Sequence, residues 1–315
     1  MDANKKILII VAIIIIAGLG LFSFSDSSNN DDRVVTIGYM PSDHHAALFI
    51  ADAQGQFEKN GIKTELIQFN NGGDMMVAIA SGDLDIAYVG ITPALSSISR
   101  GVPAKVVSSV QNEGSGIVVN PNSGINSISD LKGKTIATPG ESSIQYLLLA
   151  YALEKEGLKI DDVSITSMKV PSMMDALRTE NIDGIIAYEP YVTMAVQEGI
   201  GKEIASSYDI LPGHPCCTIV ASDDFIKNNK AELDIILSIH ENATNFINEN
   251  PDEAAELLPS DIVADSEIEK IAMEDITFTA GLDDSYIENI FDFMQIEIDL
   301  GFLKETLTES QIFSR

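Results

Sequence analysis

Short apolar runs alternate along the chain with stretches of helical patterning, and each run ends at a polar corner. Residues 36–41 read TIGYMP and residues 135–140 read TIATPG, and in both stretches an apolar run stops at a proline. Brief apolar runs bounded by turn signals are typical of buried strands. Because strands alternate with helices at this spacing, the pattern predicts parallel β-sheets covered by helices, the α/β class.

Two stretches of the chain repeat the same pattern. Residues 76–93 read MVAIASGDLDIAYVGITP, and residues 174–190 read MDALRTENIDGIIAYEP. When the second stretch is placed under the first, Asp183 falls under Asp85, and each aspartate precedes an apolar run. An internal repeat of this kind indicates two copies of one supersecondary unit. We therefore expect two lobes, each built on a unit of strand, helix, strand, helix and strand.

Two matching glycines support the repeat. Residues 57–63 (FEKNGIK) resemble residues 153–159 (LEKEGLK), and Gly61 and Gly157 occupy the same place in the two segments. A glycine at this place predicts the end of a helix, because glycine adopts the left-handed cap at little cost. The segment 223–315 has helical patterning, and we expect no clear strand in it.

These patterns predict how the chain is divided between the lobes. Lobe 1 is expected to comprise residues 33–115 and 218–315, and lobe 2 residues 116–217. Two extended segments, near residues 116–120 and 218–222, are expected to cross between the lobes as hinges. The chain without its N-terminal segment is long enough for each lobe to have a hydrophobic core of its own.

Residues 1–32 predict a membrane segment and a tether. Residues 7–24 carry no charge, and a run of this length is just sufficient to span the hydrocarbon core as a helix. Lys5 and Lys6 precede the run, which predicts that the bulk of the chain lies outside the cytoplasm. Two outcomes stay open. The helix remains as a signal-anchor that tethers the protein to the cell membrane, or it is cleaved as a signal peptide and the protein is secreted or periplasmic.

The charge of the chain limits its partners. There are 48 acidic and 19 basic side chains, which gives a formal net charge of −29 at pH 7. Binding to nucleic acid requires clustered Lys and Arg, so we expect no nucleic-acid partner. An anionic ligand would have to be held by local dipoles against the overall field. None of the arginines falls in the loops considered next, so no bidentate arginine clamp is expected.

The loops that follow the predicted strands are the expected ligand site. In open parallel sheets, ligands bind beyond the carboxyl ends of the strands. If two lobes present these edges to each other, a small molecule can be enclosed between them. The repeat identifies the loops concerned as residues 41–45, 70–73 and 90–93 in the first lobe, and 140–143, 170–173 and 188–190 in the second.

The order of these motifs resembles a known family. In their order and spacing, the motifs resemble those of the extracytoplasmic solute-binding proteins of ABC importers. The motifs are SGDLDIAYVG, DLKGKTIATPG, LEKEGL and IDGIIAYEPY. The closest resemblance is to the branch for nitrate, taurine, alkanesulfonates and thiamine-pyrimidine precursors, and it covers about residues 34–230. It implies a two-lobed periplasmic-binding fold of type II, with two hinge crossovers, and a function in delivering a small organic solute to a permease and its ATPase.

The corner at residues 140–143 (GESS) is a candidate contact for an anionic or polarised group. It has no lysine for a P-loop and no Gly-x-Ser-x-Gly elbow of a hydrolase. What remains is a helix N-terminus, whose free N–H groups attract negative charge. Ser142 either caps this helix or contacts the ligand, and both hold if Ser142 caps while Ser143 faces the cleft.

His214 and the adjacent pair Cys216 and Cys217 invite a metal site, because His and Cys are common metal ligands. His44 and His45 begin the first helix, at the corner that corresponds to residues 140–143. In extended structure the side chains of neighbouring residues diverge, and no spaced Cys or His set supplies a ligand framework. We therefore expect no metal ion and no cofactor. The cysteines either pack as small buried groups or Cys216 lines the cleft beside the hinge.

The expected site combines these loops. Tyr188 is expected to stack on the ligand, and Glu189 either binds an amine or ring nitrogen or is solvated or bonded to a hinge amide. No residue is expected to be catalytic. The residues expected to bind the solute are Ser42, His44, His45, Asn71, Gly72, Gly90, Thr92, Asn112, Gly140, Ser142, Ser143, Met173, Tyr188, Glu189 and Cys216.

Two other functions remain open from the sequence. The first is a pyrimidine-binding protein, or a pyrimidine-synthesising enzyme on the same scaffold that uses His44, His45, Cys216 or Cys217. Export of the chain argues against the enzyme, since such chemistry belongs in the cytosol. The second is a ligand sensor that docks onto a membrane receptor.

Overall fold

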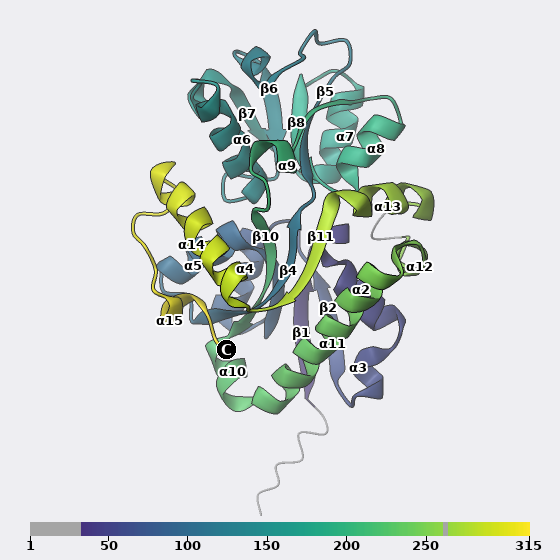
Figure 1. Cartoon of the computed structure of the whole chain (residues 1–315), viewed down its shortest axis with the longest axis vertical. Helices are drawn as coiled ribbons and strands as arrows, with labels where there is room; N and C mark the ends of the chain where they lie inside the picture. Colours follow the sequence, from purple (N-terminus) through teal and green to yellow (C-terminus); the bar gives the residue numbers. More distant parts are fainter. Residues whose placement is uncertain (1–32, 261–263) are drawn as a thin grey trace, which may run out of the picture. The chain divides into compact units, whose positions relative to one another are not determined.

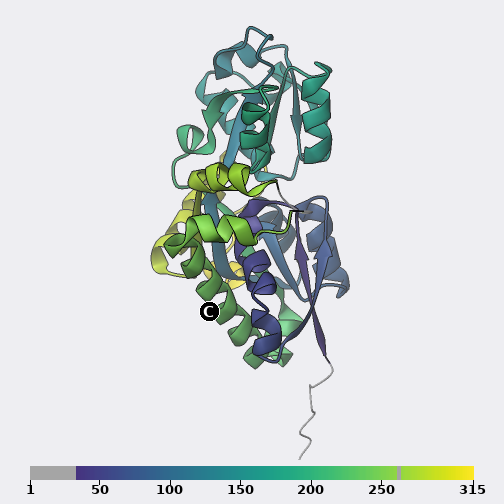
Figure 2. The same cartoon turned by 90° about the vertical axis from the view of Figure 1, so that its right-hand side faces the viewer.

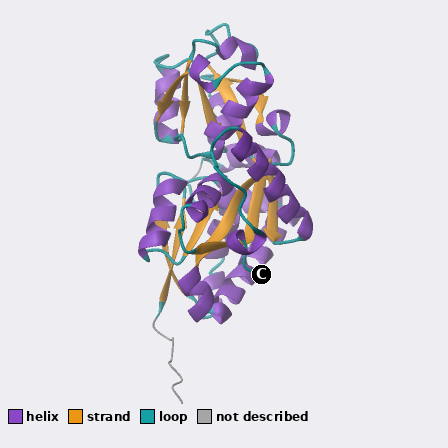
Figure 3. Ribbon diagram, turned by 90° about the vertical axis from the view of Figure 1, so that its left-hand side faces the viewer, coloured by secondary structure: helices purple, strands orange, loops and turns teal. Residues whose placement is uncertain are grey.

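The parts of the chain that the computed structural model describes, residues 33–260 and 264–315, contain two separate β-sheets (Figure 1). We call the larger sheet with its helices the first lobe and the smaller sheet with its helices the second lobe. Residues Val34–Arg315 form one compact unit. The fold is therefore α/β and two-lobed, as expected. Figure 3 shows the two groups of strands, each surrounded by helices.

The first lobe contains a six-stranded sheet in the order β11-β4-β10-β3-β1-β2. Its strands are β1 (Val34–Tyr39), β2 (Lys63–Gln68), β3 (Ile86–Gly90), β4 (Ala104–Glu113), β10 (Pro215–Ser222) and β11 (Ile276–Gly281). Its helices are η1 (Asp43–His45), α2 (Ala46–Ala53), α3 (Gln56–Lys59), α4 (Gly72–Ser81), α5 (Ile91–Ser99), α10 (Asp223–Asn228), α11 (Lys230–Glu249), α12 (Pro251–Leu257), α13 (Ser266–Ala272), η4 (Met273–Asp275), α14 (Asp284–Asp299) and α15 (Glu309–Ile312).

The second lobe contains a five-stranded sheet in the order β7-β6-β8-β5-β9. Its strands are β5 (Ser115–Val119), β6 (Thr135–Thr138), β7 (Ser164–Ser167), β8 (Gly184–Tyr188) and β9 (Lys202–Ser206). Its helices are η2 (Ile128–Leu131), α6 (Ile144–Lys155), η3 (Ile160–Asp162), α7 (Val170–Arg178), α8 (Tyr191–Gln197) and α9 (Ser207–Ile210). The central strands β3 and β8 are buried at every position, which explains their continuous apolar sequences.

The repeat predicted from the sequence is confirmed. In the first lobe β1 pairs in parallel with β2 and β3, and in the second β6 pairs in parallel with β7 and β8. The carboxylate of Asp85 accepts a hydrogen bond from the backbone N–H of Thr36 at 3.0 Å, and that of Asp183 accepts one from Thr135 at 2.8 Å. The aligned aspartates thus make the same contact in both lobes, joining the third strand of the unit to the first.

Two expectations about the sheets are wrong. The sheets are mixed, because β10 and β11 in the first lobe and β5 and β9 in the second are antiparallel to their neighbours. The C-terminal segment also contains a strand, β11, which adds to the edge of the first sheet beside β4. Its sequence ITFTAG has the alternation of a half-buried strand, but it is too short to stand out among helices.

The crossings between the lobes lie beside the expected positions. Residues 116–119 pair within the second sheet as part of β5, and residues 218–222 pair within the first sheet as part of β10. The chain instead crosses at Gly114, between β4 and β5, and at residues 207–214, between β9 and β10. Gly114 has φ 78°, a conformation that favours glycine. Figure 2 shows α12 and α13 at the level where the lobes meet.

The predicted membrane segment, residues 7–24, lies outside the described residues. Within residues 33–260 and 264–315, none of the helices combines the length and apolar character that crossing a membrane requires.

Candidate ligand-binding site

A cavity lies where the loops of the two lobes meet. Its volume accessible to a water molecule is about 40 Å³, and the empty space around it, its open mouth included, is about 460 Å³. Both lobes contribute, and most contributions follow the carboxyl ends of strands, as parallel sheets predict. The lining residues are Met40, His44, Asn71, Gly72, Gly90 and Pro93, then Pro139, Ser142, Ser143, Ile144, Gln145 and Tyr188, and finally Cys216 and Cys217. None of these lining residues is Asp, Glu, Lys or Arg.

Three helices of eight or more residues begin at this cavity. Asn71 caps α4 by accepting a hydrogen bond from the N–H of Asp74, and Ser143 caps α6 by accepting one from Tyr146. Gly90 precedes α5 and supplies no side-chain cap, so the first N–H groups of α5 have no such partner. Helix N-termini carry partial positive charge and attract anionic oxygens. Of the two roles left open for Ser142, that of helix cap is excluded, because Ser143 caps α6.

His44 and the two cysteines meet on one side of the cavity. Nε2 of His44 lies 2.7 Å from the carbonyl oxygen of Gly114, so this nitrogen carries the proton and donates. Nδ1 faces the sulfur atoms, at 3.5 Å from Cys216 and 3.9 Å from Cys217. The expectation that neighbouring cysteines diverge is wrong here. The pairing of β10 with β4 is irregular on both sides of Cys217, and the sulfurs lie near the same nitrogen.

The pKa values of the two thiols are shifted in opposite directions. Burial would raise the pKa of Cys216, but contacts with Cys217 and His44 outweigh it and hold that pKa well below its usual range. The contact with Cys216 and burial raise the pKa of Cys217.

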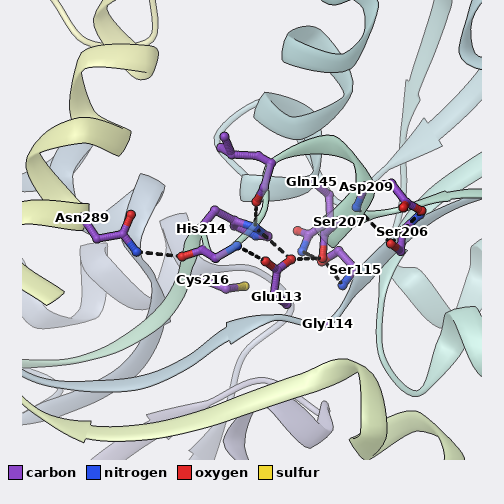
Figure 4. A network of polar contacts seen from close by, with 12 residues as sticks. Glu113, Gly114, Ser115, Gln145, Ser206, Ser207, Asp209, His214, Cys216 and Asn289 are labelled. Carbon is purple, nitrogen blue, oxygen red and sulfur yellow. Dashed lines mark hydrogen bonds and ion pairs between the residues drawn. The ribbon is translucent and has the colours of Figure 1, made fainter. Parts of the chain in front are cut away.

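A buried polar network joins the two crossings (Figure 4). The carboxylate of Glu113, at the end of β4, accepts hydrogen bonds from the hydroxyl of Ser207 at 2.9 Å and from the backbone N–H of Gly213, and it lies 3.2 Å from Nδ1 of His214. Burial opposes a charge on His214, but Cys216 and Glu113 raise its pKa to about 9. The imidazolium and the carboxylate therefore form a buried ion pair that fixes both connections near the cavity.

Seven residues of the expected site do not line the cavity. Ser42 is buried and donates to the carbonyl of Glu189 at 3.0 Å. Nδ1 of His45 accepts from the N–H of Met40, and burial lowers the pKa of His45 to about 3. Asn112 is a residue of β4 that pairs with Thr277 of β11, and Met173 packs in the core of the second lobe. Gly140, with φ 139°, precedes the lining serines. The remaining two, Thr92 and Glu189, are described below.

Glu189 supports the chain instead of facing the ligand. It is 2 % exposed, and its carboxyl oxygen accepts a hydrogen bond from the N–H of Thr193 at 3.0 Å. Burial raises its pKa to about 8, so the neutral acid predominates at neutral pH. The cavity consequently lacks the carboxylate that the sequence suggested for an amine.

Thr92 lies in a neighbouring hollow with Glu297 of α14. The carboxyl of Glu297 is fully buried, and burial raises its pKa to about 8. A group whose pKa is raised in the folded state contributes stability that is complete below its unfolded pKa, about 4.5, and is lost as pH rises through about 8.

Replacement of Glu297 by glutamine is therefore expected to remove the part of the stability loss at rising pH that Glu297 causes. Relative to the parent protein, the variant gains about 3 kcal/mol of unfolding free energy between pH 5 and pH 8. Urea unfolding at several pH values measures the effect. Glu288→Gln, an exposed position on the same helix, is the matched control and should show no such gain. An equal gain in both variants would contradict the burial of Glu297 as the cause.

The sequence missed six lining residues. Met40 and Pro139 directly precede the predicted loops 41–45 and 140–143, and Ile144 and Gln145 directly follow the second loop. The predicted loops are therefore one or two residues too short to include them. Pro93 stood at the limit of its loop. Alternation in a regular strand turns Cys217 away from Cys216, so the sequence pattern does not place both in one site. Gln145 did carry a signal, since it is a polar residue in the otherwise apolar start of α6.

Comparison with known proteins identifies the family. A model of the NMT1-like family matches residues 28–259, which is most of the chain. The chain belongs to the NMT1-like family. It is a solute-binding protein of ABC importers in the group for sulfonates, taurine and nitrate, as the sequence motifs indicated, and several of its relatives are named as binding proteins.

Three relatives illustrate the match. The taurine-binding periplasmic protein of Escherichia coli is 30% identical over 186 residues, 59% of this chain and 56% of that protein. A ligand-binding component of an ABC-type import system from Staphylococcus aureus, with zinc bound, has a TM-score of 0.78 at 21% identity, covering 90% of this chain and 97% of the other. The periplasmic aliphatic sulphonate-binding protein of Escherichia coli has a TM-score of 0.75 at 19% identity, covering 90% and 92%. The two structures show the shared fold.

Proposed function

We propose that this protein binds a small solute with an apolar body and one anionic end, an alkanesulfonate, in the cavity between its lobes. The observation that carries this proposal is the convergence of three helix N-termini, from both lobes, on a cavity whose lining contains no Asp, Glu, Lys or Arg. Oriented N–H groups stabilise an anion locally where a net charge of −29 opposes it at long range. Met40, Pro93 and Ile144 provide apolar surface for the body of the solute.

The proposed mechanism is closure of the lobes around the solute. Segments of both lobes lie close together beside the cavity: a Cβ atom added to Gly73 would lie 3.5 Å from Oγ of Ser142, and one added to Gly90 would lie 3.4 Å from Cδ1 of Ile144. A solute that contacts both sides favours the closed form, which a permease can recognise. The crossings at Gly114 and residues 207–214 are the proposed hinge.

Alkanesulfonates are proposed in preference to taurine and nitrate. The ammonium group of taurine would find no carboxylate among the residues that line the cavity, since Glu189 is buried and neutral. An unpaired charge in an enclosed site is costly. Nitrate has no apolar body to cover the apolar part of the lining. A neutral pyrimidine would leave the helix N-termini without an anionic partner.

Isothermal titration calorimetry of the full-length chain tests this preference. Ethanesulfonate is expected to bind with one site per chain, and taurine, nitrate and a neutral hydroxymethylpyrimidine are expected to bind at least about tenfold more weakly, since a lost charged hydrogen bond costs about 1.5–3 kcal/mol. Ser142→Ala should weaken ethanesulfonate binding by a similar factor. Tightest binding of taurine or of the pyrimidine would refute the proposed ligand class.

We also propose that residues 7–24 place the protein outside the cytoplasm, tethered to the cell membrane unless they are cleaved. The support is the uncharged run and the two lysines that precede it. Mass spectrometry of the protein from membrane and secreted fractions tests this: the intact N-terminus in the membrane fraction supports a tether, and a chain that begins after residue 24 supports cleavage.

A further inference from the structure

Three metal-ligating side chains lie together on the wall of the cavity. His44 and the neighbouring pair Cys216 and Cys217 each offer one ligand atom, and these atoms all lie within 4.8 Å of one another. They come from segments far apart in the sequence, η1 and β10. All three residues are buried and line the cavity.

The spacing of these atoms matches a tetrahedral zinc site. Zinc–sulfur bonds of about 2.3 Å and zinc–nitrogen bonds of about 2.0–2.1 Å place neighbouring ligand atoms about 3.6–3.8 Å apart. Nδ1 of His44 lies 3.5 Å from Sγ of Cys216 and 3.9 Å from Sγ of Cys217. Both distances from Nδ1 to the sulfurs are therefore close to those of a tetrahedral site, and the three ligand atoms all lie within 4.8 Å of one another.

The orientation of His44 is also that of a ligand. Its Nε2–H donates to the carbonyl of Gly114 at 2.7 Å, so Nδ1 is the ring nitrogen that faces the sulfurs and can bind an ion placed between them. Metal-binding histidines characteristically donate their second ring nitrogen to a carbonyl or carboxylate in this way. Gly114 is the crossing between the lobes, so the same hydrogen bond joins the cluster to the hinge.

We propose that His44, Cys216 and Cys217 bind one Zn²⁺ ion, with the fourth coordination position open toward the cavity. Two thiolates and an imidazole are ligands that zinc prefers, and two thiolates neutralise its charge. An incomplete ligand set of three is characteristic of zinc sites that hold water or a ligand. The ion would then stand beside the anionic end of a bound solute. The metal site itself does not depend on the identity of that solute.

Metal titration of the full-length chain tests the proposal. The protein is stripped of metal with a chelator under reducing, oxygen-free conditions and titrated with Zn²⁺ alone against a chromophoric competitor. We expect one tight Zn²⁺ site per chain. Titration with Co²⁺ should produce thiolate-to-metal charge-transfer absorption, which carboxylates on the acidic surface cannot produce. Absence of a tight site, or Co²⁺ binding without this absorption, would overturn the proposal.

Single substitutions assign the ligands. Because loss of an outer-shell partner alone weakens metal binding about 10- to 100-fold, Cys217→Ser and His44→Gln should each weaken Zn²⁺ binding by at least about 100-fold. Ser142→Ala, which changes a residue of the same cavity that is no ligand, should leave Zn²⁺ affinity unchanged. Circular dichroism checks the folding of each variant. Undiminished Zn²⁺ binding by folded Cys217→Ser would contradict the assignment. No sulfonate is present in these titrations, so their outcome is separate from that of the proposed function.

Discussion

Replacement of Gly90 by leucine is expected to abolish solute binding in a protein that still folds. Gly90 has φ −60°, which any residue adopts, and it lines the cavity where the lobes meet. A Cβ atom there lies 3.4 Å from Cδ1 of Ile144 in the other lobe, so the rest of a leucine side chain must enter the cavity or hold the lobes apart. We expect the affinity for ethanesulfonate to fall by more than about 100-fold, equivalent to about 3 kcal/mol.

Gly90→Ala is the matched control for this prediction. Its Cβ makes an ordinary van der Waals contact, so its affinity should stay close to that of the parent protein. Titration calorimetry gives both affinities, and thermal unfolding shows whether the variants fold. If Gly90→Leu binds as tightly as the parent protein, the solute does not occupy this cavity.

Gly114→Ala is expected to cause the largest loss of stability. Gly114 has φ 78°, where an L-residue costs about 1–2 kcal/mol. A Cβ atom would also lie 2.6 Å from Nε2 of His44 and 2.8 Å from Cγ1 of Ile276, and such overpacking costs about 1–3 kcal/mol. The unfolding free energy should therefore fall by about 2–5 kcal/mol, which urea titration measures.

Gly133→Ala separates the two causes. Gly133 also has positive φ, 74°, but a Cβ atom there meets nothing within 4 Å. Only the backbone cost of about 1–2 kcal/mol is expected. Equal losses in the two variants would show that Gly114 is not tightly enclosed between His44 and Ile276.

The sequence predicted the parts of the fold that local patterns determine. Asp85 and Asp183 were aligned because each follows a turn and precedes an apolar run, and in the structure each bonds the first strand of its unit. Gly61 and Gly157 have positive φ, 76° and 74°, as their predicted role requires. The antiparallel strands could not be predicted, because the direction of β10 and β11 is set by partners distant in the sequence.

The site was predicted to the level of loops, but not of side chains. Eight of the expected residues line the cavity: His44, Asn71, Gly72, Gly90, Ser142, Ser143, Tyr188 and Cys216. Glu189 shows why others do not, since its position at the end of β8 was correct but the side chain turns to the N–H of Thr193. Cys217 lies near His44 because the pairing of β10 with β4 is irregular at Cys217. Nothing in the local sequence HPCCT predicts that irregularity.

The central claim is that a solute is enclosed between the lobes with its anionic end at helix N-termini. A crystal structure of the protein grown with ethanesulfonate tests it most directly. The account predicts the sulfonate group within hydrogen-bonding distance of the first N–H groups of α5 and of Ser142. A sulfonate found only in another hollow, such as that lined by Tyr146 and Phe302, would contradict it.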